Sequence, residues 1–242
     1  MNKRSGAPEK GIGTTPRDPG ALSGLLAGVS FIGGVGGATA LADSPYPRPG
    51  SEPAEIRRYF TENSRSARIS ATGQLISTVS LARFTTSVAR LAARSGRGSR
   101  ALRTAAVAGG GLATAALATS ALCTLALSGS HGQDEESAAT LARRAFAAGG
   151  PIHGVGFGVL TGVLALAGLR TGELPRPVAI LGLISAASGL LSPLYFVKEA
   201  AGWFIPVGRF SGLLVSAIAG VRLARTGEPG TTTRVRRTWP TT

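Results

Sequence analysis

Arg83 is the residue best placed to do chemistry, because it is a charged side chain inside a run of small and apolar residues at 69–89. Ser80 and Ser87 lie three and four residues away and share its face of a helix. A charge inside a membrane helix costs about 2.5–3.5 kcal/mol, so Arg83 indicates a polar cleft that serves a function. The alternative is that its guanidinium extends to the membrane surface about two helical turns away.

His153 is the second candidate, and it lies among Gly154, Gly156 and Gly158. An imidazole, whose unperturbed pKa is about 6.5, can act as a protonation switch. The alternative is a histidine held in place by a hydrogen bond near the end of its span. The glycines lack the G-x-G-x-x-G spacing of a phosphate-binding loop and indicate close helix packing instead.

Patterns typical of enzymes are missing from the sequence. The single cysteine, Cys123, has no partner for a disulfide within the chain, and no spacing of His and Cys fits a metal site. An intramembrane serine protease of the rhomboid type needs Gly-x-Ser-Gly, whereas 186–189 reads Ala-Ala-Ser-Gly. The carboxylates at 134–136 lack the spacing of a calcium loop. We therefore expect no enzyme, no cofactor and no metal.

Six apolar runs must position these residues, and each is close to the roughly 20 residues that cross a bilayer. Small residues dominate them, and Gly24-x-x-x-Gly28 and Gly33-x-x-x-Gly37 have the spacing of closely packed membrane helices. We expect an all-α membrane domain at 21–225, between a disordered cytoplasmic tail at 1–20 and a basic cytoplasmic tail at 226–242. Its spans lie at about 21–42, 69–89, 103–128, 149–169, 177–197 and 203–223.

The 26 Lys and Arg residues predict the orientation, since cytoplasmic loops are enriched in positive charge. With six spans, twice as many of them lie inside as outside, and both termini are cytoplasmic. If the weakest run, 69–89, is not a span, the balance is reversed. The net charge of +14 comes from the residues that flank the runs and not from one face of a soluble domain, so nucleic acid is not an expected partner.

The first run has a second interpretation as a secretory signal peptide. Ala40-Leu-Ala42 before Asp43 fits a cleavage site, but an apolar run of about 22 residues exceeds the usual 7–15. Cleavage after Ala42 is left open by the residues themselves.

The segments between the runs give further expectations. Ser51 is expected to cap a short helix that lies on the membrane, with Ile56, Tyr59 and Phe60 toward the lipid headgroups. We expect an outer loop at 129–145 and a kink at Pro193.

Lys198, Glu199 and Arg209 bracket the turn between the last two spans. Arg209 is the second arginine inside a predicted span, and a local ion pair in this group is expected.

The order of these features resembles a set of uncharacterised six-helix integral membrane proteins of high-GC Gram-positive bacteria. Asp43-Ser-Pro-Tyr-Pro, Glu55-Ile-Arg-Arg-Tyr59 and Leu169-Arg-Thr-Gly-Glu-Leu-Pro-Arg176 carry the resemblance, which covers about 21–225. It implies a retained first helix and the six-span topology. It implies no activity, and Arg83 departs from the apolar or aromatic residue expected near that position.

Two functions are compatible with these observations. The first is a non-enzymatic protein of the cytoplasmic membrane, embedded in the lipid bilayer, that packs with itself as a homo-oligomer or with a membrane partner protein through Gly and Ala faces. The second is a transporter of a small solute or lipid with a polar cleft near Arg83. A polar cleft around Ser80 and Arg83 favours transport, whereas a tightly packed interior favours the first function.

Overall fold

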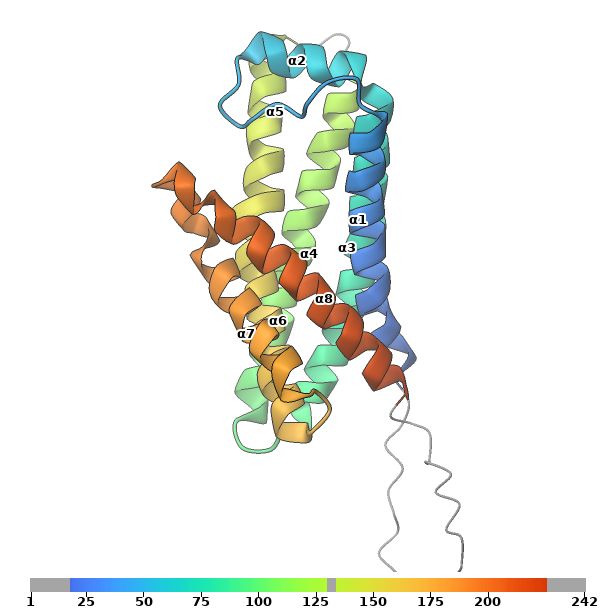
Figure 1. The fold of residues 1–242 in the computed structure, drawn as a ribbon, viewed down its shortest axis with the longest axis vertical. Coiled ribbons are helices and arrows are strands. Elements are labelled where there is room, and N and C mark those ends of the chain that lie inside the picture. Colours follow the sequence, from blue (N-terminus) through green and yellow to red (C-terminus); the bar gives the residue numbers. More distant parts are fainter. Residues whose placement is uncertain (1–17, 130–133, 226–242) are drawn as a thin grey trace, which may run out of the picture.

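The structure is a computed structural model that describes residues 18–129 and 134–225 (Figure 1). Helices joined by short connections make up these two ranges, and no strand occurs within them. The predicted all-α class is confirmed. The predicted tails at 1–20 and 226–242 lie outside the described residues, except for residues 18–20.

Five helical segments are long and apolar enough to cross a bilayer core of about 30 Å. They are Pro19–Leu41, which combines the 3-10 turn η1 (Pro19–Leu22) with α1 (Ser23–Leu41), then α4 (Ser99–Ser128), Glu135–Thr171, Arg176–Phe196 and Glu199–Arg225. Leu26, Val29 and Leu122 are more than half exposed on the outer faces of these helices, as suits contact with lipid. The chain is therefore a helical multi-pass membrane protein.

The helix α3 (Ser64–Ala93) contains the predicted span 69–89 but is not one of the five, because its Ser, Thr and Arg residues make it less apolar. It packs between α1 and α4 (Figure 1). A Cβ atom added to Gly73 would lie 2.6 Å from the Cα atom of Gly34, so the backbones of α3 and α1 touch. Glycine at both positions allows this approach.

The predicted outer loop at 129–145 is wrong over most of its length, because a helix begins at Glu135. α5 (Glu135–Ala147), the π turn η3 (Ala148–Ile152) and α6 (His153–Thr171) follow one another as one helical segment. Asp134 starts it by accepting a hydrogen bond from the Ser137 backbone N–H at 2.8 Å. At about 1.5 Å per residue, this segment is longer than the bilayer core.

The short helix α2 (Pro53–Glu62) lies across one end of the bundle (Figure 1). The prediction that its aromatic residues face lipid headgroups is wrong, since Ile56, Tyr59 and Phe60 are buried against residues of α3, α4 and α5. The projecting start of α5 supplies the apolar surface that they cover. Glu52 occupies the N-cap position expected for Ser51, and its side chain makes no capping hydrogen bond.

The last two spans are joined by two 3-10 turns. α7 (Arg176–Leu191) is followed by η4 (Ser192–Phe196), which contains Pro193. The α-helix therefore ends at the proline for which a kink was predicted. η5 (Glu199–Trp203) then leads into α8 (Phe204–Arg225), which crosses the front of the bundle in Figure 1.

The predicted glycine motif of α1 is used within the chain. A Cβ atom on Gly24 would lie 2.6 Å from the Ser216 carbonyl oxygen of α8, and one on Gly28 would contact Leu213. The site facing Gly33 is open. The first helix is thus packed against α3 on one side and α8 on the other.

Candidate functional site

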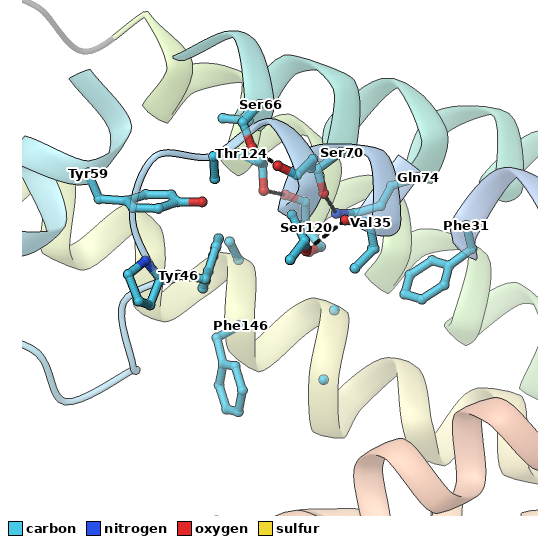
Figure 2. A pocket seen from close by; sticks show the side chains of 18 of the residues that line it. Phe31, Val35, Tyr46, Tyr59, Ser66, Ser70, Gln74, Ser120, Thr124 and Phe146 are labelled. Atoms are coloured by element: carbon cyan, nitrogen blue, oxygen red, sulfur yellow. Dashed lines mark hydrogen bonds between the residues drawn. The ribbon is translucent and has the colours of Figure 1, made fainter. Parts of the chain in front are cut away.

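A cavity of about 770 Å³ lies in the half of the bundle next to α2, and we call it the Arg209 cavity (Figure 2). α1, α3, α4, the α5–η3 junction and the start of α8 surround it. In Figure 2, Tyr46 and Tyr59 lie toward one end and Phe31 toward the other. Its volume is within the range of about 300–1,000 Å³ that is typical of pockets for small ligands.

One wall of the cavity is polar. Ser66, Ser70 and Gln74 follow at intervals of four residues on α3, so they lie on one face of that helix. Ser120 and Thr124 of α4 extend the wall with the same spacing.

Most of these polar groups are already hydrogen-bonded. The Ser66 hydroxyl donates to the Ala38 carbonyl at 2.7 Å, and the Gln74 Nε2 atom donates to the Ser70 Oγ at 3.3 Å. The exception is the Gln74 Oε1 atom, which is buried and has no partner. An unpaired buried amide oxygen costs about 1–3 kcal/mol.

The other walls are apolar and aromatic. Phe31 and Val35 come from α1, Phe146 from α5, and Ile205 and Phe210 from α8. A polar wall facing apolar walls suits an amphipathic molecule better than a hydrated ion.

Arg209 of α8 brings the charge into this cavity. Its Nη2 atom donates to the Gly149 carbonyl, and its guanidinium carbon lies 4.8 Å from the centre of the Phe31 ring. Its Nε atom is shielded and has no hydrogen-bond partner. Within the described ranges, no Asp or Glu forms an ion pair with Arg209.

The predicted local ion pair of Arg209 with the turn at 198–199 is therefore wrong. Arg209 lies more than a helical turn beyond η5, and its Nη2 atom donates to the carbonyl of Gly149 in the π turn. A methyl group at Gly149 would collide with the Ser120 side chain, so this crossing of η3 and α4 requires glycine.

His153 does not line this cavity. It is buried, its Nδ1 atom lies 3.0 Å from the Ala113 carbonyl of α4, and its ring stacks on Phe157 at 5.4 Å. Because a carbonyl only accepts, the Nδ1 atom carries the proton in this hydrogen bond. The contact links α6 to α4 at the end of the π turn.

Arg83, Ser80 and Ser87 are not brought together around one cavity. Ser80 and Ser87 are buried, whereas Arg83 is exposed on the outside of α3. Arg83 lines an open groove with Thr86 and Arg90.

Ser87 instead receives a hydrogen bond from Arg90 at 3.2 Å, and Arg90 also pairs with Asp18 at 2.8 Å. This group ties η1 to the end of α3.

Metal and thiol chemistry have little support in the described residues. No group of three or more His, Cys, Asp or Glu side chains there is arranged to hold a metal. Cys123 is a free, half-buried thiol on α4.

The sequence contains a signal for the polar wall in addition to the motifs described above. Polar residues at 66, 70 and 74 and at 120 and 124 each repeat every four positions, which predicts one polar helix face. The pattern does not show that these two faces lie next to Arg209, because their meeting depends on the packing of α8 against α1.

The chain matches no protein-family model, no curated protein and no solved structure in three separate comparisons.

Proposed function

We propose that this chain is a six-span protein of the cytoplasmic membrane that binds an amphipathic ligand from the bilayer in the Arg209 cavity. The observation that carries the proposal is a ligand-sized, mostly apolar cavity that is lined by the charged side chain of Arg209, which forms no ion pair with an Asp or Glu of the described residues. A molecule with an apolar part and a polar or charged group matches this combination of walls.

The sixth span in this proposal is α3. Its length of 30 residues is ample for a crossing, and its outward side chains Ile76 and Val79 are largely exposed, as contact with lipid requires. Arg83 is also exposed and close enough to the helix end to extend toward headgroups. Six crossings place both ends of the described bundle on one side, and the positive-inside rule makes that side cytoplasmic.

Binding a ligand is favoured over self-association as the primary role. Gly24 and Gly28, the first of the two predicted glycine motifs, pack against α8 of the same chain, whereas Gly33 of the second motif faces open space. The first motif is therefore not free to form a dimer contact. The absence of any predicted catalytic pattern in the sequence leaves binding, or transfer of the bound molecule across the membrane, as the role of the cavity.

The topology is tested by labelling single cysteines in intact cells with a membrane-impermeant thiol reagent, after Cys123→Ala. Arg48→Cys is placed in the connection between α1 and α2, at the end of the bundle where α3 begins, and Arg97→Cys in the turn after α3. We expect labelling of Arg48→Cys alone. Labelling of both would place the two ends of α3 on the same side and exclude the sixth span.

Ligand binding is tested by lipid mass spectrometry of the purified full chain. Val35 lines the cavity and is partly exposed, so Val35→Trp fills the space without disturbing the packed interior. We expect an amphipathic molecule to copurify with the parent chain and to be lost from Val35→Trp. Val79→Trp, on the exposed outer face of α3 away from the cavity, is the matched control. An identical lipid content in all three proteins would exclude the proposal.

A further inference from the structure

We infer that the ligand of the Arg209 cavity is a single-chain lipid with an acidic headgroup, of the fatty-acid class, whose carboxylate is held by Arg209. This inference rests on the proposed function and specifies the chemistry of its ligand. It depends on the charge of Arg209, the chemistry of the walls and the volume of the cavity.

The charge of Arg209 is incompletely balanced. Its guanidinium has a carbonyl on one side and the Phe31 ring against its face, both of which stabilise a cation only in part. No carboxylate of the described chain pairs with it. Charged groups within membrane spans pair with one another or with backbone carbonyls, and a bound anion would neutralise Arg209 more fully than the Gly149 carbonyl does.

The guanidinium of Arg209 defines the headgroup. It lines the cavity, its Nη2 atom donates to the Gly149 carbonyl, and the planar fork of a guanidinium matches a carboxylate. An alcohol or an uncharged ester would accept from the same guanidinium without neutralising the charge. The cavity therefore discriminates in favour of an acid.

Gln74 belongs to the polar wall of the cavity. It is 9% exposed, lines the same cavity as Arg209 and donates a hydrogen bond to Ser70. With Ser66 and Ser70, it gives the headgroup end of a ligand a polar surface on the α3 side.

The walls specify the rest of the molecule. Val35, Phe146 and Phe210 offer apolar and aromatic surface of the kind that holds an acyl chain. A volume of about 770 Å³ is that of a pocket for one compact ligand and suits a single chain better than a two-chain phospholipid.

The test is photo-crosslinking of the purified full chain in detergent micelles. The probes are palmitic acid with a photoreactive diazirine in its chain and the matched hexadecanol, at a pH where the acid is ionised. We expect the acid to label α1 or α8 with about tenfold higher apparent affinity than the alcohol, the usual value of one charge-assisted hydrogen bond. Equal affinities for acid and alcohol would overturn the inference.

Variants assign the preference to Arg209. Arg209→Gln is expected to lower the affinity for the acid about tenfold and to leave the alcohol unchanged, whereas Arg209→Lys, which keeps the charge, retains part of the preference. Arg83→Gln, which removes the other intramembrane arginine, should change neither. An unaltered acid preference in Arg209→Gln would overturn the inference, and the comparison of the two probes on the parent chain holds even if this variant does not fold.

Two further outcomes separate the inference from the function on which it rests. If acid and alcohol bind equally and Val35→Trp loses both, the cavity binds an amphipath but does not select its charge. If Val35→Trp retains both, the cavity is not the binding site and the proposed function fails too.

If phosphatidylglycerol displaces the probe about tenfold better than palmitate, the acidic lipid is a phospholipid and the fatty-acid assignment is overturned.

Discussion

The two halves of the bundle are packed differently. In the half next to the turns at 94–98 and 172–175, Phe84, Leu91 and Leu164 are fully or almost fully buried in one continuous apolar core. In the half next to α2, the helices surround the Arg209 cavity only in part, since its lining residues Val35 and Phe210 are exposed. A chain that needed only to stay folded in the membrane would gain from filling both halves.

The two arginines inside predicted spans follow the same division. Arg83 lies on the outer surface of the packed half and is exposed, so solvent or headgroups can surround its charge. Arg209 lies in the hollow half, against Phe31 and Gly149. An identical side chain is thus a surface charge in one place and a ligand-binding candidate in the other.

The largest expected effect comes from removing a large side chain in each half. Phe84→Ala should destabilise the fold by about 3–5 kcal/mol, because it opens a void in a filled core. Phe31→Ala should cost less, since Phe31 belongs to the same core cluster but borders the Arg209 cavity on one side. Thermal unfolding of both variants in the same detergent compares them, and equal losses would mean that the cavity is as well packed as the core.

A matched pair of glycines gives the next effect. A Cβ atom on Gly24 would lie 2.7 Å from the Phe84 ring, whereas one on Gly150 would meet Ile205 and Phe146 at an ordinary 3.7 Å. Gly24→Ala should therefore destabilise by about 1–3 kcal/mol through overpacking. Gly150→Ala should be neutral or slightly stabilising in the same unfolding assay. The reverse order would contradict the division into two halves.

Tyr59, beside the mouth of the cavity, gives a smaller and pH-dependent effect. Burial raises the pKa of Tyr59 above its ordinary 10.0, although a hydrogen bond to Ser66 opposes the shift. Because the folded chain holds the Tyr59 proton more tightly than the unfolded chain, protonated Tyr59 adds to the free energy of unfolding. This contribution is complete below pH 10 and is lost as the pH rises through the folded-state pKa. Unfolding temperatures should therefore fall more steeply in alkali for the parent chain than for Tyr59→Phe. Parallel curves would show that Tyr59 is freely hydrated.

The smallest effect is expected at the surface of the packed half. Arg90 and Asp18 form an ion pair at 2.8 Å, but the Arg90 side chain is 57% exposed. Asp18→Asn should therefore change stability by no more than about 1 kcal/mol. A double-mutant cycle with Arg90→Gln measures the pair, and a coupling well above this value would mean that the end of α3 is less accessible than its exposure indicates.

The positions of five long apolar helices could be predicted from the sequence. Length and apolar composition are local properties, and a bilayer leaves the backbone of a long apolar segment little alternative to a helix. The close-packing role of Gly24 and Gly28 was also predictable, since their spacing places them on one face. The sequence alone did not say that their partner is α8 of the same chain.

Tertiary structure decided which side chains are buried. Burial depends on what lies opposite each residue, so α2 turns Tyr59 and Phe60 inward only because α5 extends to meet them. For the same reason Arg83 is exposed and Arg209 half-buried, although both looked alike as single charges in apolar runs. The Arg209 cavity exists because helices far apart in the sequence leave a space between them, and no local pattern encodes that space.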